Sequence, residues 1–185
     1  MRVISGTRKG HILKSPKGLN TRPTQDRIKE SLFNILGIVN NESKVLDLFA
    51  GSGSIGIEFL SRGAKECYFI DNSYESIKII KENLTSTRLD EKAHVYKNNV
   101  VNALNVLGSK SIDFDYIFMD PPYRKNLVFS AMESIYNNNL IKNDGIIIVE
   151  HEKELILDEK ILNFTKSDER NYSDKIISFY KKIMF

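Results

Sequence analysis

Three glycines in the segment 45–60 follow an apolar stretch in the order G-x-G-x-x-G. They are Gly51, Gly53 and Gly56, and Asp47 precedes the first of them by four residues. Glycines at a strand-to-helix turn let the backbone come close to a ligand and let the helix pack tightly on the strand. Asp71 follows Gly51 by 20 residues and could accept hydrogen bonds from ribose hydroxyls. The pattern predicts an adenosine-type ligand, and both a nicotinamide cofactor and S-adenosylmethionine fit it.

The charge of Asp47 favours the second of these ligands. A carboxylate near the glycines would repel the pyrophosphate of a nicotinamide cofactor, whereas it would attract the ammonium and sulfonium of S-adenosylmethionine. Opposite charges about 4 Å apart attract by roughly 1 to 4 kcal/mol between water and an effective dielectric of 20. The alternative is that Asp47 only caps or orients the loop.

A second candidate site is the tetrapeptide Asp120-Pro121-Pro122-Tyr123, which directly follows the apolar segment 114–119. The prolines fix φ and stiffen the turn, so that the Asp120 carboxylate and the Pro121 carbonyl can face one point. Two acceptors without a donor suit an exocyclic NH₂ group, whose nitrogen then becomes pyramidal and can attack a methyl group. Tyr123 offers a face on which a flipped base can stack. The alternative is a rigid turn with Tyr123 in the core.

The elements that must position these residues alternate between strand and helix from residue 44 onward. This alternation predicts a doubly wound, mostly parallel Rossmann-like sheet of the α/β class. The expected strands are 44–49, 66–71, 92–97, 113–119 and 145–150, and the expected helices are 54–62, 74–86, 100–107 and 126–139. The segments 161–168 and 175–182 predict a C-terminal antiparallel hairpin. A small N-terminal extension is expected as a β-hairpin within 2–20 and a helix from Asp26 to Gly37.

The 185 residues suffice for one compact domain, and 41% of them are hydrophobic. Cys67 is the only cysteine, and the histidines are scattered, so we expect neither a disulfide nor a metal site. With no apolar run of membrane-spanning length and no secretory signal, we expect a cytoplasmic protein.

The net charge of +3 is unevenly distributed along the chain. The first 30 residues hold eight basic and two acidic side chains, a balance of +6, so the rest of the chain carries −3. A basic arm favours a polyanionic partner, although a solvated, solubilising segment is the alternative.

Taken together, the segments 47–56 and 120–123 resemble the class I, S-adenosylmethionine-dependent amino-methyltransferases. The N-terminal segments 2–6, 21–24 and 30–34, with Asp26-Arg27, resemble the RsmD family, bacterial methyltransferases of guanine N2 in 16S ribosomal RNA. The resemblance extends over nearly the whole chain, including the segments 170–174 and 178–180.

This resemblance implies a role for each matching residue. The cofactor would be bound by Asp47, Phe49, Ala50, Gly51, Ser52, Gly53, Gly56, Asp71, Asn72, Asn98 and Asn99. Many related enzymes carry an acid near the adenine, where this chain has only the two amides of Asn98 and Asn99. Asp120, Pro121, Pro122 and Tyr123 would form the catalytic target-base pocket. RNA would be contacted by Arg2, Arg8, Lys9, Arg22, Thr24 and Arg27, with Arg22 and Thr24 close to both ligands.

The resemblance further implies a monomer that methylates guanine 966 of 16S rRNA, within an assembling small ribosomal subunit. Residues 1–40 would be the RNA-facing extension and 41–185 the methyltransferase domain. Four alternatives stay open from the residues: an N6-adenine methyltransferase on DNA or RNA, a protein glutamine-N5 methyltransferase, a nicotinamide oxidoreductase and a non-catalytic RNA-binding module.

Overall fold

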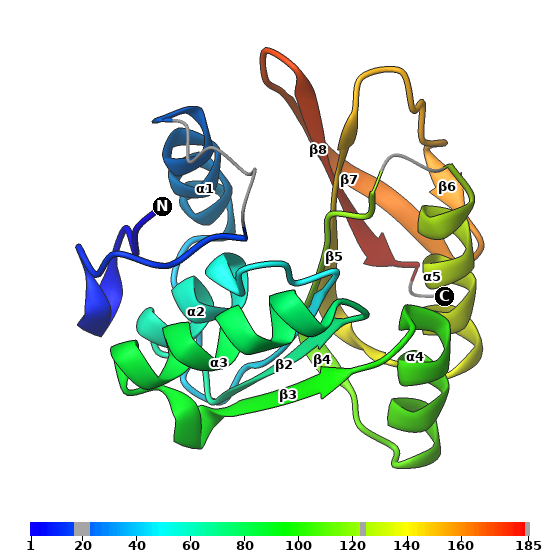
Figure 1. The fold of residues 1–185 in the computed structure, drawn as a ribbon. Coiled ribbons are helices and arrows are strands. Elements are labelled where there is room, and N and C mark those ends of the chain that lie inside the picture. The colour runs from blue at the N-terminus through cyan, green and yellow to red at the C-terminus, as the bar shows by residue number, and fades with distance from the viewer. Residues whose placement is uncertain (17–22, 123–124, 184–185) are drawn as a thin grey trace.

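The chain folds around an eight-stranded sheet in a computed structural model that describes residues 1–16, 23–122 and 125–183 (Figure 1). The parallel strands are β1 (Lys44–Leu48), β2 (Glu66–Asp71), β3 (Ala93–Lys97), β4 (Phe114–Met119) and β5 (Ile141–Glu152). The antiparallel strands are β6 (Lys160–Ile161), β7 (Phe164–Asn171) and β8 (Lys175–Lys182). The strand order is β3-β2-β1-β4-β5-β8-β7-β6. The order reverses between β1 and β4, where open α/β sheets bind their ligands.

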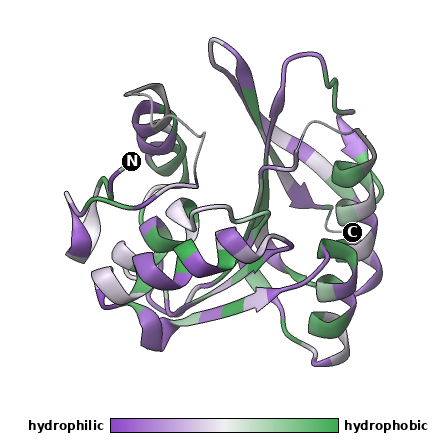
Figure 2. Cartoon of the chain, in the orientation of Figure 1, coloured by the Kyte–Doolittle hydropathy of each residue, from purple (hydrophilic) through white to green (hydrophobic). Residues whose placement is uncertain are grey.

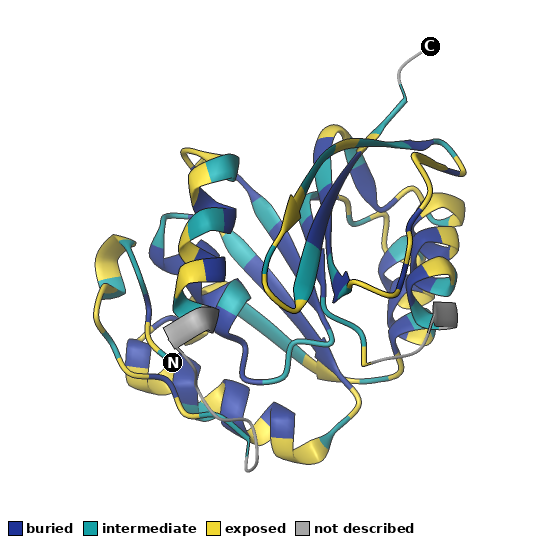
Figure 3. Cartoon of the chain, turned by 90° about the horizontal axis from the view of Figure 1, so that it is seen from above, coloured by how far each residue is buried: buried dark blue, intermediate teal, exposed yellow. Residues whose placement is uncertain are grey.

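Helices cover both faces of this sheet, which confirms the predicted doubly wound arrangement. On one face lie α4 (Val100–Ser109) and α5 (Lys125–Asn137), and on the other lie α1 (Pro23–Leu36), α2 (Ser54–Ser61) and α3 (Tyr74–Thr87). Successive strand residues point to opposite faces, so Leu46 packs with α4 and α5 while Val45 packs with α1 and α2. The central strands are largely hydrophobic (Figure 2) and mostly buried (Figure 3).

Several element boundaries differ from those expected, each for a local reason. α1 begins at Pro23 instead of Asp26. Proline suits the first helical position because it lacks a backbone N–H, and an N–H there would have no partner within the helix. α4 continues past Gly108, where a Cβ would lie 2.3 Å from Asn138 Oδ1, so glycine permits close packing of α4 on the end of α5. β5 begins at Ile141, because residues before a register shift also pair with β4.

The N-terminal segment forms a ribbon with a single bridge, between Arg2 and Ile12, where a β-hairpin is predicted. A short 3-10 helix, η1 (Gly6–Arg8), occupies its turn. Val3 and Leu13 are 1% and 3% exposed and belong to the same apolar cluster as α1 and α2. The ribbon is therefore packed onto the body of the protein.

The predicted C-terminal hairpin is confirmed by β7 and β8, although its first strand spans Phe164–Asn171 instead of 161–168 because residues 160–161 form the separate strand β6. At the turn between them, the Tyr172 hydroxyl donates to Ser31 Oγ of α1 at 2.7 Å. Because α1 and this turn both contribute side chains to the cavity described below, the contact joins two of its walls.

Within the described ranges, no helix is long and apolar enough to cross a membrane.

Candidate active site

Four acidic side chains stand in a row across the carboxyl ends of four neighbouring parallel strands. Asp71 ends β2, Asp47 lies in β1, Asp120 follows β4, and Glu150 lies in β5. Strand alternation and register place all four on the face of the sheet that α1 and α2 cover. A cavity of about 830 Å³ opens over this row and is lined by all four residues. The sheet thus unites the two segments that the sequence singled out.

The loop after β1 has an unusual backbone at three positions. Phe49, Gly51 and Gly53 have φ values of 58°, 55° and 74°, in the left-handed region. Glycine adopts this region freely, whereas it costs a phenylalanine on the order of 1–3 kcal/mol. The loop is fixed by bonds from Ala50 N–H to Ile70 O at 3.0 Å and from Gly53 N–H to Ala50 O at 2.7 Å. Phe49, Ala50, Gly51 and Ser52 all line the cavity.

Gly56 serves the packing of α2 on the sheet. A Cβ at this position would lie 2.3 Å from Phe69 Cε1 and 2.7 Å from Cys67 Sγ. Its N–H donates to Asp47 Oδ2 at 2.9 Å. Neither Gly53 nor Gly56 contributes to the cavity wall, so these two glycines shape the loop and the helix without facing the cavity.

Asp47 is the most buried carboxyl of the row, with 1% of the residue exposed. Burial raises the pKa of Asp47 to about 8; the Gly56 N–H opposes this shift, and the charges of Asp71 and Asp120 add to it. A positively charged ligand group would offset the cost of ionising this buried carboxyl. The cavity therefore favours a cationic ligand and disfavours a pyrophosphate.

Asp71 ties the end of β2 to the glycine loop. Its Oδ2 accepts the N–H of Gly51 at 2.8 Å, and its Oδ1 accepts the N–H of Ser73 at 2.8 Å. A carboxylate has about four acceptor sites, so two sites remain for a ligand. Asn72, the next residue, also lines the cavity.

The two asparagines after β3 differ in their positions. Asn99 lines the cavity, and its Oδ1 caps α4 by accepting the N–H of Val101 at 3.0 Å. Its amide nitrogen is the group that could reach an adenine. Asn98 is half-buried and does not line the cavity.

Asp120, Pro121 and Pro122 form the corner after β4, and all three line the cavity. Lys175 Nζ, from the first residue of β8, lies 3.4 Å from Asp120 Oδ2 and forms a close ion pair with Glu150 Oε1. Burial raises the pKa of Asp120, the charge of Glu150 raises it further, and Lys175 lowers it. Tyr123, expected as the stacking residue, lies outside the described residues.

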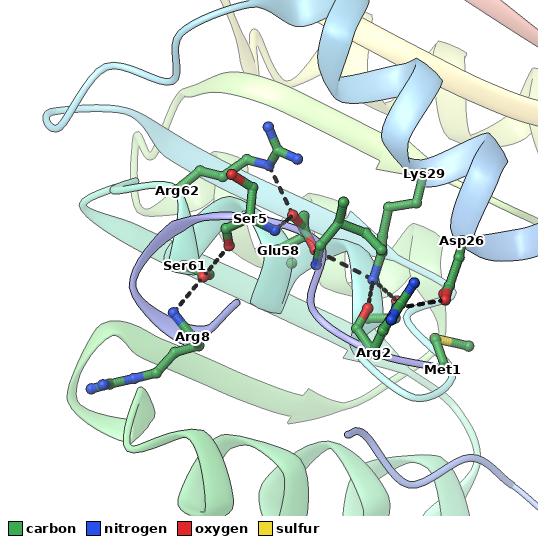
Figure 4. Close-up of polar contacts among 12 residues, drawn as sticks. Met1, Arg2, Ser5, Arg8, Asp26, Lys29, Glu58, Ser61 and Arg62 are labelled. Carbon is green, nitrogen blue, oxygen red and sulfur yellow. Dashed lines mark hydrogen bonds and ion pairs between the residues drawn. The ribbon is translucent and has the colours of Figure 1, made fainter. Parts of the chain in front are cut away.

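A buried ion cluster holds the N-terminal ribbon and α1 against α2 (Figure 4). Glu58 of α2 accepts the N–H groups of Ile4 at 2.8 Å and Ser5 at 2.9 Å. It also pairs with Arg62 at 2.9 Å and with Lys29 of α1 at 3.4 Å. Lys29 is itself part of the cavity wall. Sequence reasoning missed this cluster, because Lys29, Glu58 and Arg62 are ordinary charged residues up to 33 positions apart and belong to no motif.

Asn83 of α3 makes a second connection between the ribbon and the loop. It is 1% exposed, and its Nδ2 donates to Ser52 O at 2.9 Å and to Lys14 O at 3.0 Å. Its Oδ1 accepts the N–H of Lys14 at 2.8 Å. Nothing in the sequence distinguishes this asparagine from the others.

Sequence reasoning also missed Glu150, although a signal for it was present. Glu150 directly follows an apolar run near the carboxyl end of a strand, as Asp71 and Asp120 do.

The residues predicted to contact RNA are spread over the N-terminal part. Arg2 lies near the cavity and pairs with Asp26 at 3.2 Å, while Arg27 is exposed on α1. Arg8 bonds to Ser61 and Arg88, so it and exposed Lys9 lie at the far end of α2, about 12 Å from the end that faces the cavity. Arg22 and the side chain of Thr24 lie outside the described residues.

Metal ligands do not gather in the described part of the chain: no three His, Cys, Asp or Glu side chains are arranged to hold an ion.

Comparisons with known proteins show the family and the fold. Residues 1–181 match the model of the family described as "Conserved hypothetical protein 95". The protein YlbH of Bacillus subtilis (strain 168) is 39% identical over 182 residues, which cover 98% of this chain and 99% of YlbH. Ribosomal RNA small subunit methyltransferase D of Haemophilus influenzae is 37% identical over 155 residues, covering 83% of this chain and 80% of the relative. The solved structure of yhhF from Escherichia coli superposes with a TM-score of 0.84 at 32% identity, covering 98% of this chain and 97% of that one.

Proposed function

The chain belongs to the Conserved hypothetical protein 95 family, that of the RsmD methyltransferases, and from this premise we propose that it methylates the exocyclic N2 amine of a guanine in small-subunit ribosomal RNA. One structural observation carries the proposal: the Asp47 loop and the Asp120 corner face a single cavity from neighbouring strands. A methyl donor and a target amine held at these two places would be next to each other.

The methyl donor is S-adenosylmethionine, and the residues present fit it. Asp47 and Asp71 line the cavity beside the glycine loop, and burial raises the pKa of Asp47 to about 8. A ligand with an ammonium and a sulfonium would stabilise the ionised carboxylates, whereas a pyrophosphate would be repelled by them. Asp47 and the loop 49–53 would hold the methionine end, Asp71 and Asn72 the ribose, and Asn99 the adenine.

The residues of this chain would mainly align the reacting groups. Bound S-adenosylmethionine supplies a methyl group on sulfur, and its carbon–sulfur bond breaks as the nitrogen–carbon bond forms, with the electron pair left on sulfur. Asp120 and the Pro121 carbonyl would accept the two amine hydrogens and aim the nitrogen lone pair toward the donor side. Such alignment can contribute about 7 to 11 kcal/mol. The alkylated nitrogen then loses its proton to water, so Asp120 acts as a positioner and need not be a strong base.

The RNA-facing part would be residues 1–40, placed on a methyltransferase domain of residues 41–185. The ribbon and α1 contribute Met1, Ile28, Lys29 and Leu32 to the cavity wall. Exposed basic side chains of the ribbon and of α1, Arg2 and Arg27 among them, would bind phosphates around a flipped guanine. Three further points rest on the resemblance alone. They are that the target is guanine 966, that the substrate is an assembling small subunit, and that the protein acts as a monomer.

The proposal is tested by supplying labelled S-adenosylmethionine with unmodified small-subunit rRNA, with small subunits assembled from it, and with DNA. Mass spectrometry of the digested nucleic acid then identifies the methylated nucleoside, and primer extension maps its position. We expect N2-methylguanosine at one site in the RNA. Methylation of DNA only, or of adenine, would overturn the proposed substrate, and absence of any transfer would overturn the activity.

A further inference from the structure

Glu150 and Lys175 line the cavity, yet nothing in the proposed function so far uses them. Their side chains are 13% and 24% exposed, and Lys175 forms ion pairs with both Glu150 and Asp120. A lysine held between two carboxylates in a cavity wall is a polar arrangement that a ligand with matching donors and acceptors can use.

The two residues continue the acidic row beyond Asp120, on the side away from the glycine loop. Met119 pairs with Val149 in register, so Asp120 and Glu150 are the next pair along β4 and β5 and point to the same face. Ile177 of β8 pairs with Glu150, and Lys175 lies two residues before it, within diagonal reach of a long side chain. Counted by strand, the order is therefore acceptor on β4, acceptor on β5 and donor on β8, with the Lys175 ammonium turned back between the two carboxylates.

This order complements one edge of guanine. Along its Watson–Crick edge, guanine carries the N2 amine, the N1–H and the O6 carbonyl, which are donor, donor and acceptor. Adenine and cytosine also have an exocyclic amine, but the ring nitrogen beside it is an acceptor in both. That nitrogen would face the Glu150 carboxylate with lone pair against lone pair, and enzymes that flip a base commonly identify it through this edge.

We propose that Glu150 and Lys175 select guanine, an inference that rests on the proposed function. With the N2 amine held at Asp120, Glu150 accepts the N1–H and Lys175 donates to O6. Glu150 has acceptor sites enough to keep its pair with Lys175 while it binds N1–H. The ammonium needs only to turn from Asp120 toward O6, which frees the Asp120 oxygens for the amine.

The test compares two target bases in the same RNA. Small-subunit rRNA is ligated to carry either guanine or 2-aminopurine at the mapped target, and is used both free and assembled into subunits. 2-Aminopurine keeps the amine but has an acceptor at N1 and no O6. The measured quantity is the ratio of kcat/KM for guanine to that for 2-aminopurine.

We expect the unaltered protein to prefer guanine by about 10- to 100-fold, the discrimination typical of paired base contacts. Glu150→Gln can offer an N–H to N1, and it should reduce the preference about tenfold. Lys175→Met should lower kcat/KM for guanine more than kcat/KM for 2-aminopurine, because only guanine loses a contact at O6, so the preference for guanine should fall. The control Glu154→Gln makes the same change at an exposed residue beyond the end of β5, outside the cavity wall, and should keep the full preference.

The outcomes separate the inference from the proposed function. If the unaltered protein methylates guanine and both cavity variants keep its preference over 2-aminopurine, selection by Glu150 and Lys175 is overturned while the proposed function stands. Equal losses for both bases would also overturn it, because they would assign the pair a structural role. If the unaltered protein methylates neither RNA, the proposed function fails, and the inference with it.

Discussion

The Lys29 ammonium and the Glu58 carboxylate lie 3.4 Å apart, and their side chains are 3% and 0% exposed. The ammonium also donates to Arg2 O at 2.6 Å and to Ser54 Oγ at 3.1 Å. Burial lowers the pKa of Lys29, and the neighbouring Glu58 opposes this shift. The pair thus joins the N-terminal ribbon, α1 and the start of α2, directly behind the glycine loop.

Removing one member of this pair should destabilise the protein strongly. Glu58→Gln leaves the Lys29 ammonium buried without a counter-charge, and losing one partner of a buried pair costs about 3–5 kcal/mol. Denaturant unfolding measures the change. Glu42→Gln breaks an exposed pair with Lys65 and should leave the midpoint unchanged. If Glu58→Gln unfolds at the same denaturant concentration as the unaltered protein, the cluster does not hold the ribbon in place.

Gly56→Ala tests the close packing of α2 on β2. The added methyl would meet Phe69 and Cys67, which are both 0% exposed and cannot move aside easily. Overpacking of this kind costs about 1–3 kcal/mol. The double variant Gly56→Ala, Phe69→Leu provides space for the methyl and should recover part of the loss. If the alanine alone is neutral, Gly56 is not needed for this packing.

The sequence predicted the sheet well because its strands are apolar on both sides and are separated by clear helix signals. The boundaries of α4 and β5 were wrong because they depend on packing: Gly108 stays helical to admit Asn138, and β5 pairs across a register shift. The N-terminal ribbon depends on Val3 and Leu13 reaching a core formed by distant segments. No local sequence pattern predicts such a long-range contact.

The candidate site was predictable where residue type and chain position suffice, as for Asp47, Asp71 and Asp120. The left-handed backbone of Phe49 was not, since phenylalanine has no preference for it. Lys175 was not either, because an antiparallel strand brings it to Asp120 across 55 residues of sequence. Beyond the motifs, the structure chiefly adds Glu150 and Lys175, which line the cavity on the side away from the glycine loop.

The affinity for S-adenosylmethionine should rise with pH. Asp47 has an ordinary pKa of about 4 in the unfolded chain, and burial raises this pKa to about 8 in the folded protein. Below pH 8 it is largely protonated and must release this proton to bind a cation, so affinity should rise up to tenfold per unit toward pH 8 and then level off. Calorimetry from pH 6 to 9 measures this. Asp47→Asn should abolish the rise, and a flat profile for the unaltered protein would contradict the assignment.

The same shift makes a second prediction, about the stability of the protein without ligand. The folded state holds the Asp47 proton more tightly than the unfolded state, so this carboxyl contributes less stability as pH rises from about 4 to about 8. Asp47→Asn should therefore gain stability over the unaltered protein as pH increases through this range. Thermal unfolding at several pH values measures the difference, and a constant difference would mean that Asp47 is ionised throughout.

Asp120→Ala should separate binding from chemistry. The corner lies on β4, beyond the loop that would hold the methyl donor, so affinity for S-adenosylhomocysteine should stay nearly unchanged. Methyl transfer should fall by about 10²- to 10³-fold, the usual loss when one preorganised hydrogen-bonding group is removed. Calorimetry and single-turnover transfer give the two values. Parallel loss of both would assign Asp120 a structural role.

The contribution of the basic extension to RNA binding is best tested by neutralising charges. Deleting the ribbon would also remove Val3 and Leu13 from the core, and weaker binding could then reflect unfolding. Lys9 and Arg27 are exposed, so Lys9→Gln and Arg27→Gln should leave stability unchanged. Each lost phosphate contact should flatten the dependence of log affinity on log salt by about 0.7 to 0.9. The control Lys65→Gln removes an exposed charge outside the extension and should leave the slope intact. Because Lys9 lies at the far end of α2, an effect of Arg27→Gln alone would place the RNA on α1 and away from the turn of the ribbon.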